Sequence, residues 1–110
     1  MVASKMNKTD YKIFKELAHT IRLKFPEAKI WAFGSCVNNN SIKDSDLDVC
    51  IVVNEMNDTI DKTIMDIAWN VGFNNDILIS TVTYARKDFE SGPVSAGSFV
   101  KSIIKHGIAA

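Results

Sequence analysis

The sequence predicts a small α+β domain, layered like an α/β sandwich, in which helices flank a three-stranded mixed sheet. Three observations support this fold class: apolar stripes with helical spacing, short runs rich in β-branched and aromatic residues, and the alternation of the two along the chain. The expected order is helix, strand, short helix, strand, helix, strand, helix. The chain has 110 residues, 46% of them hydrophobic, so we expect residues 1–110 to form a single domain with a modest core.

The first helix is expected over residues 8–25. Asn7 or Thr9 is placed to cap its start, and Pro26 ends it because the residue before a proline avoids helical dihedrals. Its spacing gives one apolar stripe, made of Ile13, Phe14, Leu17, Ala18, Ile21 and Phe25.

The three strands are expected at Lys29–Phe33, at the apolar run that ends with Val53, and at Asp76–Thr83. One helical turn at residues 35–38 and a short loop at 39–45 connect the first two strands, which favours antiparallel pairing. A helix then crosses over to the third strand, which makes the sheet mixed.

That crossover helix is expected at residues 59–71, with Asp58 or Thr59 as its cap and Gly72 as its stop. Tyr84 to Glu90 reads as a short helix or turn. The chain then breaks at Ser91-Gly92-Pro93, and a last amphipathic helix ends at Gly107; its apolar residues are Phe99, Val100, Ile103 and Ile104.

Two carboxylates open the second strand, in the order Asp46-Leu47-Asp48. Alternate residues of a strand share a face, so Asp46 and Asp48 would lie roughly 6.5–7 Å apart along the chain and could jointly hold divalent cations. Mg²⁺ favours carboxylate oxygens together with substrate phosphates. Leu47 and the alternate residues after it would face the core.

Gly34-Ser35 follows the first strand directly. Gly34 lacks a Cβ, which lets a phosphate approach the backbone, and Ser35 can cap a short helix or donate its hydroxyl to a phosphate oxygen. The simpler alternative is a helix cap with no ligand. A third carboxylate, Asp76, would share the metal or accept a proton from an attacking hydroxyl if its strand lies beside Asp48.

A calcium-binding loop is a poor alternative for Asp44, Asp46, Asp48 and Glu55. Val49 stands where such a loop needs glycine, and a β-branched residue resists the positive φ required there.

Composition excludes several other classes. Thirteen basic residues balance thirteen acidic ones, so nothing favours direct binding to nucleic acid. No apolar run has the length of a membrane span, and Met1 to Asp10 lacks the apolar centre of a signal peptide. The two cysteines, Cys36 and Cys50, fit neither a zinc spacing nor a disulfide framework, so we expect a reduced, cytoplasmic protein.

Together these residues resemble the polymerase-β-like nucleotidyltransferase superfamily, whose pattern is Gly-Ser, a spacer, Asp-x-Asp on a strand and a later Asp. The likeness is greatest to the minimal nucleotidyltransferases (MNT), which are about this long and commonly work beside a helical HEPN partner. Two departures are Cys36, where many relatives have a basic residue, and Asn38–Asn40, where they have a glycine.

The resemblance implies a nucleotidyltransferase fold and an enzyme that uses two Mg²⁺ ions and ATP. Asp46, Asp48 and Asp76 would be the catalytic and metal-binding residues, Gly34 and Ser35 the phosphate-binding residues. The product would be AMP on a hydroxyl, plausibly a tyrosine of a HEPN toxin, which would make the protein an antitoxin. It would assemble with the HEPN protein, with itself, or with both.

A second hypothesis, of a different class, is a binding module that neutralises the HEPN partner by complex formation alone, with a weak or inactive nucleotide site. The departures at Cys36 and Asn38–Asn40 favour this hypothesis, and the three aspartates disfavour it.

Overall fold

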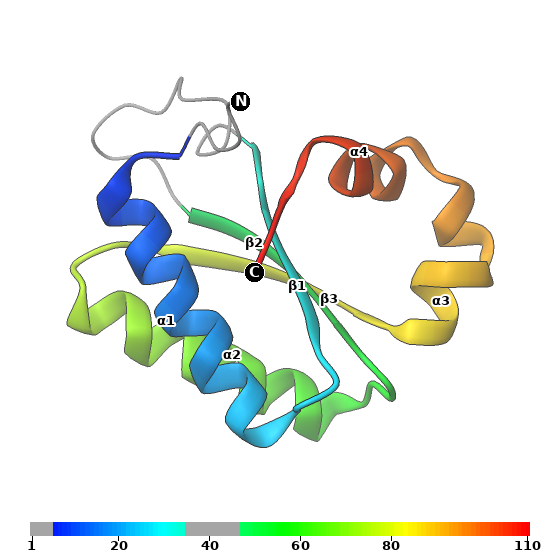
Figure 1. Cartoon of the computed structure of the whole chain (residues 1–110). Helices are drawn as coiled ribbons and strands as arrows, with labels where there is room; N and C mark the ends of the chain where they lie inside the picture. The colour runs from blue at the N-terminus through cyan, green and yellow to red at the C-terminus, as the bar shows by residue number, and fades with distance from the viewer. Residues whose placement is uncertain (1–5, 35–46) are drawn as a thin grey trace.

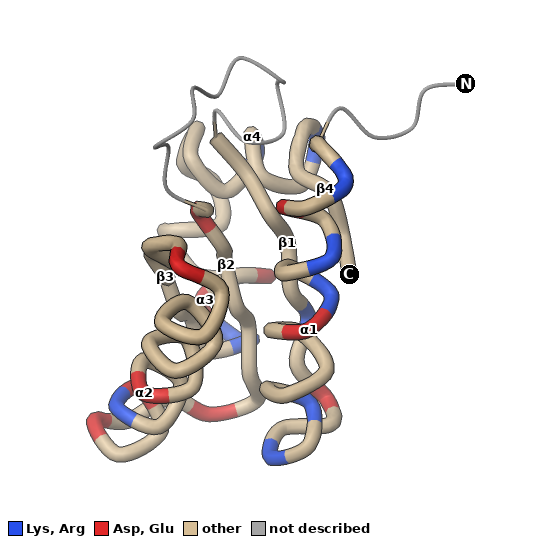
Figure 2. Tube along the Cα trace, turned by 90° about the vertical axis from the view of Figure 1, so that its left-hand side faces the viewer, with Lys and Arg blue, Asp and Glu red and all other residues tan. Residues whose placement is uncertain are grey.

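The computed structural model describes residues 6–34 and 47–110, and Figure 1 shows how their elements are arranged. The elements, in chain order, are α1 (Lys8–Lys24), β1 (Lys29–Phe33), β2 (Leu47–Val53), α2 (Asp58–Asn74), β3 (Ile79–Ala85), α3 (Arg86–Ser91), the 3₁₀ helix η2 (Pro93–Ala96), α4 (Ser98–His106) and β4 (Ile108–Ala109). No helix in this described part is long and apolar enough to cross a membrane. Charged residues lie mostly on the helices and connecting turns (Figure 2).

The strands form one mixed sheet in the order β3-β2-β1-β4. β1 pairs antiparallel with β2, and α2 crosses over so that β3 lies parallel to β2, as the sequence predicts. A fourth strand, β4, was not predicted because two residues are too few to show a pattern. β4 pairs with β1 through Trp31↔Ala109 and Ala32↔Ile108.

The helices α1 and α2 cover one face of the sheet (Figure 1), and this face holds the larger core. Phe14 and Leu17 of α1 are fully buried there. Alternate residues of β2 point to this face, as predicted: Leu47, Val49, Ile51 and Val53.

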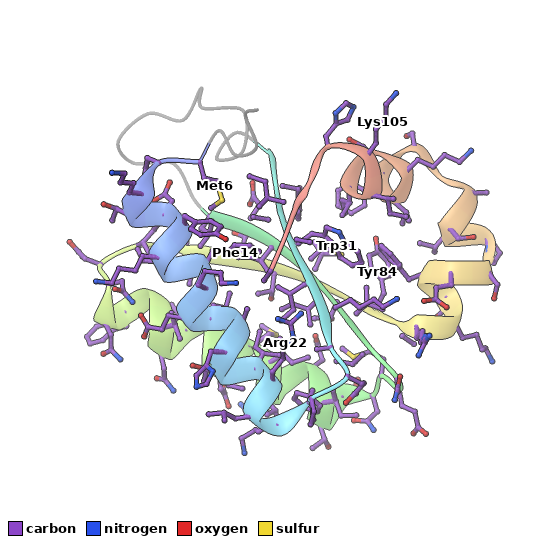
Figure 3. The ribbon with its side chains drawn as sticks, viewed as in Figure 1. Met6, Phe14, Arg22, Trp31, Tyr84 and Lys105 are labelled. Atoms are coloured by element: carbon purple, nitrogen blue, oxygen red, sulfur yellow. The ribbon has the colours of Figure 1, made fainter. Side chains whose placement is uncertain are left out.

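A smaller core fills the opposite face, beneath α3 and α4. Trp31 stacks on Phe89 with 5.2 Å between ring centroids, and Tyr84 lies 5.6 Å from the same ring. Figure 3 shows Trp31 and Tyr84 on this side of the sheet and Phe14 on the other. Cys50 and Val52 of β2 belong to this face, and so does Asp48 by alternation.

The helix ends differ in part from the prediction. Asn7 caps α1, accepting a hydrogen bond from the Asp10 N–H at 2.7 Å. The cap of α2 is Asn57, which accepts from the Ile60 N–H at 2.8 Å, so the prediction of Asp58 or Thr59 was wrong. Two other residues that cap helices well follow Asn57 directly, so the sequence alone does not distinguish the cap.

Gly72 does not stop α2, which continues to Asn74. This glycine is buried, and a Cβ on it would lie 2.6 Å from the Ile77 carbonyl oxygen. Because Gly72 has no side chain, the residues after α2 can fold back tightly against the helix. Gly72 therefore has a packing role, although a glycine near the end of a helix also fits the pattern of a helix stop.

The third strand begins at Ile79, three residues later than predicted, and includes Tyr84. Asn75 and Asp76 form a turn instead, in which the Asp76 N–H donates to the Phe73 carbonyl at 3.3 Å. Asp76 has φ of 57°, the left-handed conformation that aspartate tolerates better than most residues.

Candidate active site

Asp48 lies near the start of β2, on the face covered by α3 and α4, and is half-buried. The strand register places Phe33 of β1 on one side of it and Ser80 of β3 on the other. Directly opposite residues in a sheet project from the same face, so Phe33, Asp48 and Ser80 form a row across three strands.

Gly34 is next to Asp48 in space. It has φ of +82°, and a Cβ at this position would lie 2.7 Å from Oδ2 of Asp48. Only glycine avoids both the backbone strain and this collision. The fold thus brings together two of the predicted site residues, with the bare backbone of Gly34 lying close against the Asp48 carboxylate.

Ser35 and Asp46 lie outside the described residues, so their predicted roles stay predictions. The same holds for the helical turn expected at residues 35–38, for the loop at 39–45, and for the departures at Cys36 and Asn38–Asn40.

Asp76 is not placed beside Asp48 by the strand register. Its turn precedes β3, its side chain is exposed, and it lines a hollow against α2 together with Trp69 and Phe73. The residue opposite Asp48 on β3 is Ser80, which sequence reasoning missed. Ile77 and Leu78 lie between the turn and the start of β3, so strand pairing begins only at Ile79. This start of pairing sets the register and places Ser80 opposite Asp48.

A hollow of about 410 Å³ opens between the end of β1 and α4, bordering Gly34. Two rings, Phe33 and Phe99, meet edge to face in its wall with 5.3 Å between centroids. Ser102 and His106 of α4 add a hydroxyl and an imidazole to its lining. The hollow therefore offers both apolar walls and hydrogen-bonding groups, and it borders Gly34, which lies against Asp48.

Cys50 lies two residues from Asp48 on the same face of β2 and is fully buried. Burial raises the pKa of the Cys50 thiol to about 12, so this side chain is a neutral thiol at physiological pH. The pKa of Tyr84 is also raised, first by burial and then by its proximity to Cys50. Lys101 and Lys105 are exposed on α4, and Figure 3 shows Lys105 pointing away from the sheet.

The described ranges contain no group of three His, Cys, Asp or Glu side chains able to hold a metal ion. The donor chemistry nevertheless fits Mg²⁺ at Asp48, because a carboxylate oxygen is a ligand that Mg²⁺ prefers and the glycine beside it has no side chain to cover it. Asp46, the predicted second ligand, lies outside the described residues.

A family model described as nucleotidyltransferase domain matches residues 14–110, which include β1, β2 and β3. No curated protein and no solved structure matches. The mixed sheet flanked by helices is consistent with the nucleotidyltransferase fold, with one strand more than predicted. The match covers most of the chain and includes the Gly34-Asp48 pair, and the chain belongs to the nucleotidyltransferase domain family.

Proposed function

We propose that this protein transfers the nucleoside monophosphate of a nucleoside triphosphate, AMP from ATP, to a hydroxyl group. The carrying observation is the Gly34-Asp48 pair, in which the bare backbone of a glycine turn lies against a carboxylate, in a chain of the nucleotidyltransferase domain family. The acceptor oxygen bonds to the α-phosphorus, the bond from that phosphorus to the bridging oxygen breaks, and pyrophosphate leaves with the electron pair. The proton of the hydroxyl passes to a carboxylate or to solvent.

The chain's own residues divide the work by position. The turn at Gly34 admits the outer phosphates, and Ser35 is the proposed hydroxyl donor to them. Asp46 and Asp48 are the proposed ligands of two Mg²⁺ ions, with Asp76 as a third candidate. Bound Mg²⁺ would supply charge neutralisation for the triphosphate and for the leaving pyrophosphate.

The base of the nucleotide fits the hollow beside Gly34. A flat aromatic base packs on Phe33 and Phe99, while Ser102 and His106 can hydrogen-bond its edge. Since the hollow borders the glycine, one nucleotide can occupy the hollow with its base and the glycine turn with its phosphates.

The proposed acceptor is a tyrosine of a HEPN toxin, whose modification would make the protein an antitoxin. The resemblance to the minimal nucleotidyltransferases supports this proposal.

The second candidate is a binding module that neutralises a HEPN partner without chemistry. One observation favours it: the strand neighbour of Asp48 on β3 is Ser80, a hydroxyl where a third carboxylate would be most useful.

Transfer of label from α-labelled ATP to a co-purified HEPN partner tests the proposal. Replacing both Asp46 and Asp48 with Asn should lower transfer by at least ~10²–10³-fold, the scale seen when one preorganised stabilising group is lost. Glu55→Gln, which neutralises an exposed carboxylate just after the far end of β2, is the matched control and should transfer normally. Full rescue from the toxin by the double variant, with no transfer in any variant, would establish the binding module instead.

A further inference from the structure

β3 forms the outer edge of the sheet among the described residues. The Leu47 N–H donates to the Leu78 carbonyl, which fixes the alternation of the strand. Backbone groups of the even-numbered residues therefore face β2, and those of Ile79, Thr81 and Thr83 face outward. A continuous row of backbone donors and acceptors is left without a strand neighbour in the described part of the chain.

This edge lacks the devices that usually protect such strands. Its seven residues, Ile79–Ala85, include no Lys, no Pro and no charged side chain, and the register to β2 runs without a bulge. An exposed edge strand of this kind readily pairs with another strand. Where natural proteins have such an edge without charges, proline or a bulge, another part of the protein or a partner usually covers it.

An apolar stripe on α2 lies alongside the edge. Met65, Trp69 and Phe73 recur every four residues, and Trp69 and Phe73 are 66% and 75% exposed. Leu78, also exposed, continues the stripe beside β3. Trp69 lines two hollows of about 420 and 510 Å³ whose other walls come from α2, β3 and the turn between them. We name β3, Met65, Trp69, Phe73 and Leu78 together the edge surface.

The charges at the two ends of β3 are opposite. Asp76 precedes the strand and Arg86 follows it, each five positions from Thr81. An antiparallel second β3 centred on Thr81 would bring the turn that holds Asp76 in each copy toward the end of β3 that Arg86 follows in the other, where Arg86 also pairs with Glu90 of its own chain at 3.2 Å. A parallel neighbour would instead place like charges together. Thr81 faces outward with both backbone groups, so it can form a hydrogen-bonded pair with its own copy.

We propose that the edge surface is the interface of a two-fold dimer, in which a second copy of this chain adds its β3 antiparallel to the first. The proposal does not depend on the nucleotide chemistry. An exposed strand edge pairs with an extended partner. The opposite charges near the two ends of β3 favour the antiparallel direction, and Thr81 at its centre can pair with Thr81 of the second copy. No Lys or Arg belongs to the edge surface, which disfavours a nucleic acid as its occupant.

The apolar content suits a stable dimer. An aromatic side chain carries about 150–250 Å² of surface, so Trp69 and Phe73 at their observed exposure offer roughly 100–190 Å² each. Met65 and Leu78, which are 55% and 54% exposed, and the outward backbone groups of β3 add to this area on each copy.

Sedimentation or light scattering of the full chain tests the state of association. Wild-type protein should be dimeric at about 100 μM, and Trp69→Lys should weaken association at least ~30-fold, as expected for a central aromatic. Leu23→Lys, which adds the same charge at a 70% exposed leucine on α1, should remain dimeric. Circular dichroism on each variant confirms that it is folded.

Cysteine cross-linking tests the register, in a background with Cys36→Ser and Cys50→Ala. Thr81→Cys should give a covalent dimer on oxidation, since a hydrogen-bonded antiparallel pair has Cα atoms about 5.5 Å apart. Thr83→Cys should not, because its two copies would be roughly 13 Å apart along the strands. A monomeric wild type, a dimer that survives Trp69→Lys, or equal cross-linking at both positions would each overturn the proposal; a monomer would leave a strand of another protein as the occupant.

Discussion

The two faces of the sheet differ in how completely they are covered. Beneath α1 and α2 the apolar side chains form one continuous core, which includes the fully buried Phe14, Leu17 and Ile64. Beneath α3 and α4 the core is smaller, and the hollow beside Gly34 lies between β1 and α4. One face therefore holds most of the buried core, and the other leaves a hollow that borders Gly34.

The largest expected effect is on the closed face. Phe14→Ala removes a fully buried ring from the larger core and should lower the free energy of unfolding by about 3–5 kcal/mol. Ile103→Ala, in the smaller core, should cost less, about 2–3 kcal/mol, because nearby hollows let the site relax. Urea denaturation measures both values. A larger loss at Ile103 than at Phe14 would reverse the comparison of the two faces.

The next effect concerns the open end of the second face. Gly34→Ala adds a Cβ within 2.7 Å of Asp48 Oδ2 and forces alanine into a positive φ, at a cost of roughly 1–2 kcal/mol in backbone strain. The protein should fold with a lowered melting temperature and should lose most of its affinity for Mg-ATP. Gly97→Ala is the control, because Gly97 has φ of −73° and its added Cβ would meet only the Val94 carbonyl at 3.2 Å. Calorimetry that finds equal Mg-ATP affinity in both variants would contradict the phosphate role of Gly34.

Patterns that act through neighbouring residues were predicted well. The stripe on α1, the alternation in β2 and the crossover through α2 all follow from periodicity, and the structure agrees. Gly34, which was singled out from residue type alone, has a positive φ and lies against Asp48.

Features that depend on where pairing starts were predicted poorly. Asp76 was assigned to a strand because the apolar run follows it directly, but Asp76 lies in a turn, and Ile77 and Leu78 follow that turn before β3 begins at Ile79. The register between β2 and β3 then places Ser80 beside Asp48. No local sequence pattern indicates this pairing. The strand β4 and the buried Gly72 also depend on contacts with distant residues.

The buried thiol of Cys50, in the smaller core beneath α3 and α4, gives a prediction about how stability depends on pH. The pKa of Cys50 is about 12 in the folded protein against an ordinary value of 9.0, so the unfolded chain loses this proton first as pH rises. Stability from Cys50 is fully present below pH 9 and declines between pH 9 and about 12, by at most ~1.4 kcal/mol per pH unit. Cys50→Ala should remove this part of the decline, as thermal unfolding across that range will show. A profile unchanged by Cys50→Ala would mean that the thiol has the same pKa in the folded and the unfolded protein.

The smallest expected effect lies at the rim of the same face, where α3 meets β1. Glu90 accepts hydrogen bonds from Arg86 Nε at 3.2 and 3.3 Å, and its pKa is lowered chiefly by that bond, with further help from Lys29 at 3.5 Å. A lowered carboxyl pKa stabilises the fold above the unfolded pKa and loses that effect as pH falls through the folded value. Because Glu90 is fully exposed, solvent screens the pair and overall stability should barely change. Arg86→Gln should therefore raise the pKa of Glu90 toward its ordinary value in an NMR titration, while Lys87→Gln, one residue further on, should leave it unchanged. An equal response to both variants would show that general charge, and not the hydrogen bond from Arg86, sets this pKa.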